Sequence, residues 1–118
     1  MTKFLSMSSA DAQVAIAAAM THEELQSNTV ELAQRLGWVE YHPWDSRHSR
    51  SGYPDLTLFH PGQTRILWVE LKIEGDKRTP AQLAFGELIT LCGGEYHLWY
   101  PREWLSGEIE RVLKGAEQ

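Results

Sequence analysis

The sequence predicts one α/β domain in which helices cover a central β-sheet. Two observations indicate this class: the segments follow the order helix, three strands, helix, strand, helix, and no repeat or low-complexity linker divides them. The chain has 118 residues, of which 42% are hydrophobic and 23% charged, which suits one core and is too short for two. We expect a single domain over residues 21–118, preceded by a partly helical N-terminal extension, residues 1–20.

The first helix of the domain is predicted over residues 22–36. Thr21 and Glu24 have the spacing of a capping box, in which each side chain accepts a hydrogen bond from the backbone of the other residue. Gly37 suits the position after the helix. Apolar and small residues recur at helical spacing between these ends, at Leu25, Thr29, Leu32, Ala33 and Leu36.

Three strands are predicted next. Residues 38–42 are aromatic and β-branched and end at Pro43, and a polar, basic loop extends to Pro54. Residues 55–59 and 65–72 are strand-like runs joined by a short turn that contains Pro61 and Gly62. We expect these two runs to pair as an antiparallel hairpin.

The remaining elements are a helix, a strand and a final helix. Thr79 and Pro80 provide an N-cap and a first-turn proline for a helix to about residue 91, and a Gly-Gly pair breaks it. The single cysteine, Cys92, lies in this apolar segment and is expected in the core. A strand over residues 95–100 follows, and one amphipathic helix is predicted to begin at Pro101 and to carry Trp104, Leu105, Ile109 and Val112.

The second strand of the hairpin combines an apolar face with two charged residues. Because side chains alternate along a strand, Glu70 and Lys72 share one face, whereas Leu67, Val69 and Leu71 share the other. Pairing of the hairpin brings Asp55 beside Glu70. Two carboxylates form an oxygen site of the kind that Mg²⁺ or Mn²⁺ prefers.

Hydrolysis of a phosphodiester requires a metal that polarises the phosphoryl oxygen and acidifies a water, together with a nearby cation. Lys72 is positioned to be that cation. On its own, a Glu-x-Lys tripeptide is more typical of an exposed ion pair at a strand end than of a catalytic site. The segment Gly52 to Asp55, the hairpin and the segment Thr79 to Gln82 make the catalytic interpretation the stronger one.

At these residues the chain resembles the VRR-NUC family of the PD-(D/E)xK nuclease superfamily, particularly its small stand-alone phage-type members. The resemblance runs from about Thr21 to Tyr100. It implies a restriction-endonuclease-like core, in which a mixed central sheet is flanked by helices.

The resemblance also implies roles for individual residues. The metal-binding Asp and Glu of the family correspond to Asp55 and Glu70, its Lys to Lys72, and the Gln of the following helix to Gln82, all four in the catalytic set. Members carry a further Glu on the first helix near a Gln, which implies Glu23 or Glu24 as a metal ligand. In an alternative register, His22 takes that position.

The net charge of −5 argues against a general, charge-driven binder of nucleic acids. Bound divalent cations would offset the carboxylates of a nuclease site, and basic residues gather around it. We interpret them as contacts to DNA phosphates, with solvated loop residues as the alternative; they are Arg47, Arg50, Lys77 and Arg78. Charged residues interrupt every apolar stretch, so we expect no membrane association. The single cysteine fits a reducing cytoplasm, and the resemblance to phage-type members implies that of a bacterium or a phage-infected host.

The function predicted from the sequence is a Mg²⁺- or Mn²⁺-dependent endonuclease that hydrolyses DNA phosphodiester bonds. The resemblance implies branched substrates such as Holliday junctions, and a two-fold homodimer suits a symmetric junction. A restriction-type double-strand endonuclease is the enzymatic alternative. A non-cleaving nucleic-acid-binding module on the same core is the alternative from another class.

Overall fold

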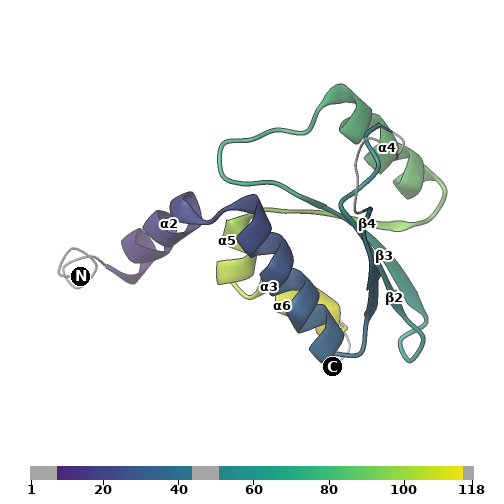
Figure 1. The fold of residues 1–118 in the computed structure, drawn as a ribbon, viewed down its shortest axis with the longest axis horizontal. Helices are drawn as coiled ribbons and strands as arrows, with labels where there is room; N and C mark the ends of the chain where they lie inside the picture. Colours follow the sequence, from purple (N-terminus) through teal and green to yellow (C-terminus); the bar gives the residue numbers. More distant parts are fainter. Residues whose placement is uncertain (1–7, 44–50, 116–118) are drawn as a thin grey trace.

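A four-stranded mixed sheet forms the centre of the molecule (Figure 1). The structure is a computed structural model, and it describes residues 8–43 and 51–115. The strands lie in the order β1-β2-β3-β4, and β3 and β4 are parallel whereas the other neighbours are antiparallel. Their bounds are Val39–Tyr41 for β1, Leu56–His60 for β2, Arg65–Leu71 for β3 and Glu95–Trp99 for β4. The predicted α/β class and hairpin are confirmed.

Helices cover both faces of the sheet. Their bounds are Ser9–Ala19 for α2, His22–Arg35 for α3, Pro80–Leu91 for α4, Pro101–Leu105 for α5 and Glu108–Lys114 for α6. Figure 1 shows α3, α5 and α6 on one side of the sheet and α4 on the other, while α2 extends away from the body and packs against α5. Within the described ranges, no helix has the length and apolar character needed to cross a membrane.

Capping boxes begin the two helices that border the site. The Oγ1 atom of Thr21 accepts the Glu24 N–H at 3.1 Å, and Glu24 Oε1 accepts the Thr21 N–H at 3.0 Å. Thr79 and Gln82 repeat the arrangement in α4, with distances of 3.2 Å and 2.8 Å. The starts of α3 and α4 therefore lie where the sequence predicted them, and each is fixed by a reciprocal pair of hydrogen bonds.

The core lies between the sheet and the side covered by α3 and α6. Five leucine and valine side chains of β2 and β3 are at most 1% exposed: Leu56, Leu58, Leu67, Val69 and Leu71. They pack against residues of α3 and α6 and two tryptophans, namely Leu25, Ala33, Ile109, Leu113, Trp38 and Trp99. The predicted apolar face of β3 is confirmed, and side-chain alternation directs Glu70 to the opposite face.

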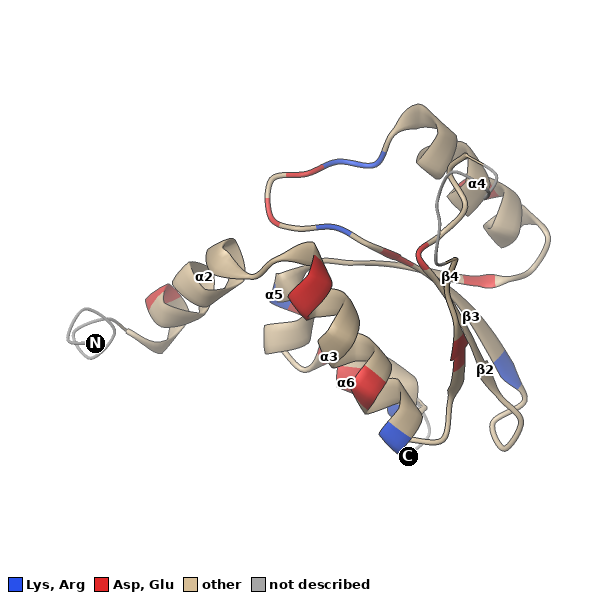
Figure 2. Cartoon of the chain, viewed as in Figure 1, with Lys and Arg blue, Asp and Glu red and all other residues tan. Residues whose placement is uncertain are grey.

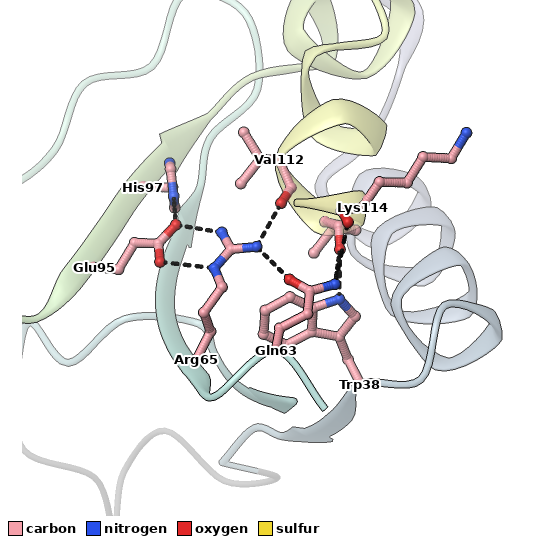
Figure 3. A network of polar contacts seen from close by, with 8 residues as sticks. Trp38, Gln63, Arg65, Glu95, His97, Val112 and Lys114 are labelled. Atoms are coloured by element: carbon pink, nitrogen blue, oxygen red, sulfur yellow. Dashed lines mark hydrogen bonds and ion pairs between the residues drawn. The ribbon is translucent and has the colours of Figure 1, made fainter. Parts of the chain in front are cut away.

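A polar network holds the C-terminal helix onto the turn end of the hairpin (Figure 3). The Nε and Nη2 atoms of Arg65 donate to the two carboxylate oxygens of Glu95 at 3.1 Å and 2.5 Å, and Nη1 donates to the Val112 carbonyl at 2.9 Å. Gln63 Nε2 and Trp38 Nε1 donate to the carbonyl of Leu113 at 3.1 Å and 3.0 Å. Side chains thus satisfy carbonyls that a helix end leaves without intrahelical donors.

Two predictions about local structure are wrong. The final segment forms two helices rather than one, because Ser106 caps α5 and Gly107 adopts a left-handed φ of 87° that starts a new direction. Cys92 is exposed and not in the core. It is the C-cap of α4, where the chain leaves the helix before the turn to β4.

Candidate active site

Asp55 and Glu70 meet at the open end of the hairpin. Leu56 pairs with Val69, so continuation of the same register sets Asp55 opposite Glu70. Asp55 Oδ2 accepts the backbone N–H of Leu71 at 2.8 Å, which fixes the aspartate against β3. The predicted juxtaposition of the two carboxylates follows from strand register and from this hydrogen bond.

Glu70 is a buried carboxyl group, with 2% of its surface exposed. Its Oε2 accepts a hydrogen bond from Gln82 Nε2 at 3.0 Å, whereas its buried Oε1 accepts none from the residues that the structure describes. Burial, together with the charge of Asp55, raises the pKa of Glu70 to about 8. An isolated buried carboxylate is costly, so this atom requires a proton or a cation.

Lys72 continues the line of β3 beyond its last paired residue. Its backbone N–H donates to the Trp99 carbonyl at 3.0 Å, which keeps the chain aligned with β4 at this point. The positive charge of Lys72 lowers the pKa of Glu70, opposing the larger effect of burial. The structure therefore brings Lys72 into the electrostatic environment of the two carboxylates.

Gln82 links the start of α4 to the buried carboxylate. Its Oε1 accepts the Thr79 N–H in the capping box, which leaves its Nε2 directed at Glu70. One side chain therefore caps the helix and orients the carboxylate. The sequence predicted Gln82 as a member of the site, and the capping box explains the direction of its amide.

The N-terminus of α3 brings His22 into contact with Asp55, and Glu23 or Glu24 as a metal ligand stays a prediction. His22 Nε2 lies 3.5 Å from Asp55 Oδ2, and this hydrogen bond raises the pKa of His22. Glu24 is engaged in the capping box with Thr21. Glu23 lines an open groove of about 490 Å³ along α3 that also includes His22. From the sequence, His22 was predicted only as an alternative to the glutamates. The exact start of the helix decides which side chain of the first turn faces Asp55, and the sequence pattern left that open.

The loop before Asp55 is packed against α4. Gly52 has a φ of +87°, and a Cβ atom there would lie 2.4 Å from the carbonyl oxygen of Ala81. The hydroxyl of Tyr53 contacts Thr57 Oγ1 at 3.0 Å and accepts a hydrogen bond from Trp68 Nε1 at 3.1 Å. Glycine and these hydrogen bonds hold the approach to Asp55 in place.

The predicted basic residues differ in their surroundings. The loop between β3 and α4 carries both basic and acidic residues (Figure 2). Lys77 is exposed, whereas the guanidinium of Arg78 lies over the Tyr96 ring at 5.8 Å and its Nη1 donates to the Tyr96 hydroxyl at 3.4 Å. Arg47 and Arg50 lie outside the described residues.

The donor set suits a hard divalent cation. Asp55 and Glu70 offer carboxylate oxygens, and the buried Oε1 of Glu70 accepts no hydrogen bond from the described part of the chain. That part contains no group of three or more His, Cys, Asp or Glu side chains that could hold an ion. The pair would therefore leave coordination positions for water and substrate, as magnesium sites commonly do.

A mixed sheet flanked by helices, with Asp55, Glu70 and Lys72 at one end of a hairpin, defines the class of PD-(D/E)xK nuclease domains. The VRR-NUC domain model matches residues 7–100, a range that contains all four residues of the predicted catalytic set. The chain belongs to the VRR-NUC domain family, whose members are nuclease domains of this type.

A solved structure described as a VRR_NUC domain has the same fold. It is 23% identical to this chain, with a TM-score of 0.65, and the similarity covers 82% of this chain and 98% of the other. No curated protein matches the chain. The predicted family and restriction-endonuclease-like fold are confirmed by the family match and the structural similarity.

Proposed function

We propose that this protein is a metal-dependent endonuclease that hydrolyses phosphodiester bonds of DNA. The observation that carries the proposal is the proximity of Asp55 to a buried Glu70 whose Oε1 accepts no hydrogen bond from any described residue. A protein that only binds DNA does not require two carboxylates at its binding site, because their charge repels the anionic backbone. A nuclease requires them, because the two carboxylates would hold a cation whose charge offsets that of the phosphate.

Asp55 and Glu70 are the residues that would hold Mg²⁺ or Mn²⁺. When bound, the ion polarises a phosphoryl oxygen and acidifies a water. Leu71 orients Asp55 through its backbone N–H, and Gln82 orients Glu70 through its amide, so the two carboxylates are positioned before substrate binds. This preorganisation is the contribution that the protein makes to a metal site.

Lys72 is proposed to act on the substrate rather than on the ion. An ammonium group next to the carboxylate pair would stabilise negative charge that develops on the phosphate, or orient the attacking water by a hydrogen bond. Gln82 belongs to the catalytic set as a positioning residue, because its described contacts are to Glu70 and to its own helix cap.

The proposed DNA contacts are local positive groups near the site, which attract phosphate although the net charge of the protein is −5. His22 is the first residue of α3 and Gln82 lies in the first turn of α4, so both helices begin beside the carboxylates, and helix N-termini favour anions. Lys77 is exposed and free to reach a phosphate, and Arg47 and Arg50 precede Asp55 in the sequence. Arg78 is proposed as a weaker contact, since it already binds Tyr96.

We propose further that the substrate is branched DNA and that a homodimer cuts it. The sheet face that carries Glu70 also carries a row of exposed apolar side chains, since Val39 pairs with Phe59 and Phe59 with Ile66. With Tyr41, these residues are between 40% and 62% exposed, and we call them the apolar row. A two-fold contact through the row would bury apolar surface and present two sites to symmetry-related strands.

The experiment that tests this function offers the protein labelled duplex, flap and four-way junction DNA with Mg²⁺, Mn²⁺ or EDTA. We expect cleavage in either metal, fastest on the junction, and none in EDTA. Faster cleavage of plain duplex would favour the restriction-type alternative. Binding without cleavage in both metals would reject the nuclease proposal in favour of a non-cleaving module.

A further inference from the structure

The N-terminal turn of α3 directs an imidazole at the carboxylate site. His22 Nε2 lies 3.5 Å from Asp55 Oδ2. The side chain of His22 is 44% exposed and that of Asp55 is 28% exposed, whereas Glu70 is almost fully buried. The exposure of the three groups thus increases from Glu70 through Asp55 to His22, and His22 is open to solvent.

The capping box explains why His22 takes this position. Thr21 is the N-cap, so His22 is the first helical residue and projects at the start of α3. Glu24 is held back by its hydrogen bond to the Thr21 N–H, and Glu23 faces the groove along α3. Among the described residues of this turn, His22 is the side chain in contact with Asp55.

The separation of the two donor atoms is compatible with a shared ion. Ligand bonds from imidazole nitrogen and carboxylate oxygen are about 2.0–2.2 Å long, so neighbouring ligands lie roughly 3.0–3.5 Å apart. Carboxylate oxygen suits Mg²⁺ and Mn²⁺ alike, whereas imidazole nitrogen suits transition metals. A nitrogen ligand would therefore shift the preference of the site away from Mg²⁺.

We propose that His22 is a ligand of the divalent ion held by Asp55 and Glu70, and that it makes the site prefer Mn²⁺ to Mg²⁺. This inference rests on the proposed metal site. In the described part of the chain without metal, no three His, Cys, Asp or Glu side chains are arranged to hold an ion, so the proposal requires these side chains to move together when the ion binds.

The test is Mn²⁺ binding to the full chain, measured by titration calorimetry and by electron spin-echo spectroscopy of the bound ion. The variant is His22→Ala, and the matched control is His42→Ala, which removes an exposed histidine that lines the same groove and pairs with Glu40. Mg²⁺ affinity is measured in parallel. Asp55→Asn tests the carboxylate site itself, and circular dichroism verifies that each variant is folded.

We expect nitrogen coupling to Mn²⁺ in the wild type and in His42→Ala, and its loss in His22→Ala. Since loss of an outer-shell partner already costs about tenfold or more in metal affinity, loss of a direct ligand should weaken Mn²⁺ binding by at least about tenfold. Mg²⁺ affinity should fall by a smaller factor.

Three outcomes would overturn the inference. If nitrogen coupling is absent while Asp55→Asn still weakens Mn²⁺ binding, the metal site stands and His22 is not its ligand. If Mn²⁺ binds more tightly to His22→Ala, the imidazole competes with the ion for Asp55. If Mn²⁺ does not bind, or binds Asp55→Asn equally well, the proposed carboxylate site fails together with the inference.

Discussion

The burial of Glu70 is the feature that most clearly separates this site from an ordinary strand. Of the charged side chains that the structure describes, Glu70 is the one buried to this degree, and Gln82 compensates only one of its two oxygens. A carboxyl group in such surroundings keeps its proton well above its ordinary pKa unless a cation binds. Metal binding should accordingly release a proton and strengthen as the pH rises towards 8.

Without metal, Glu70→Gln should stabilise the protein at pH 8 more than at pH 5. The pKa of Glu70 is about 8 in the folded state, above its ordinary value of 4.5, so only the unfolded chain loses this proton between those values. The wild type therefore loses stability as the pH rises, by on the order of a few kcal/mol, and the glutamine does not. Urea unfolding at both pH values measures the difference.

Glu31→Gln on the exposed surface of α3 is the control for this comparison, since it removes an equal charge from an exposed side chain nine residues along the helix from His22. A stability difference between Glu70→Gln and wild type that is the same at pH 5 and pH 8 would contradict the burial of a protonated Glu70.

At the scale of single residues, the sequence predicted that the two carboxylates lie side by side, but not all of the residues that surround them. Asp55 and Glu70 followed from strand alternation and hairpin pairing, which depend on local pattern. His22 did not, because one residue of helical register rotates a side chain by about 100° and decides whether it faces the site. Cys92 was placed wrongly, since an apolar neighbourhood in sequence does not reveal which side of α4 is covered.

At the scale of elements, the site is held between the starts of two helices. Gln82 joins the cap of α4 to Glu70, and His22 joins the start of α3 to Asp55. Positions next to capping boxes are well defined, which explains why the sequence predicted both helix starts. The break at Ser106 and Gly107 was missed because apolar residues keep helical spacing on both sides of it.

Gln82→Glu should keep the fold of α4 and lose cleavage. Thr79→Ala should lower the stability of the protein and keep cleavage. Glutamate at the third helical position still accepts the Thr79 N–H, but it replaces the donor to Glu70 with a repelling charge. Thr79→Ala removes the cap and should cost about 1 kcal/mol of stability. Thermal unfolding and cleavage rates of both variants test this division. Equal cleavage by Gln82→Glu and wild type would remove Gln82 from the site.

Gly52→Ala should destabilise the protein and slow cleavage. An added Cβ would approach the Ala81 carbonyl oxygen at 2.4 Å and would strain a left-handed backbone, which displaces the loop leading to Asp55. Gly75→Ala is the matched control, because Gly75 has a similar φ of +92° but no atom within 4 Å of the added group. We expect a loss of about 1 kcal/mol for Gly75→Ala and more for Gly52→Ala. Equal losses would show that the contact with α4 is unimportant.

At the scale of the whole molecule, the site and the apolar row share one face of the sheet. The other face is filled by α3, α5 and α6, whereas α4 covers only part of the face that carries Glu70 (Figure 1). The family match and the mixed sheet were predictable, because the order of the elements and motifs can be recognised in the amino-acid sequence. The part of a sheet face that stays uncovered was not predictable, since it depends on how far α4 extends across the strands.

Ile66→Glu should convert a homodimer into a folded monomer. Ile66 lies in the apolar row and is 43% exposed, so a charge there is tolerated in the monomer but not in a buried two-fold contact. Sedimentation at micromolar concentration measures the change, and Val14→Glu on α2 is the control outside the row, since Val14 is 69% exposed. A wild-type protein that sediments as a monomer would contradict the dimer and leave the metal site untouched.

The central claim is that Asp55 and Glu70 form the metal-dependent centre that cuts DNA. Its most direct test is single-turnover cleavage, in Mn²⁺, of the DNA substrate that the wild type cuts fastest. Because Asp55→Asn and Glu70→Gln keep the shape of each side chain and remove its charge, we expect each to slow cleavage by about 10³-fold or more while Glu31→Gln cuts at the wild-type rate. Cleavage by either site variant at close to the wild-type rate, or undiminished cleavage by the wild type in EDTA, would contradict the claim.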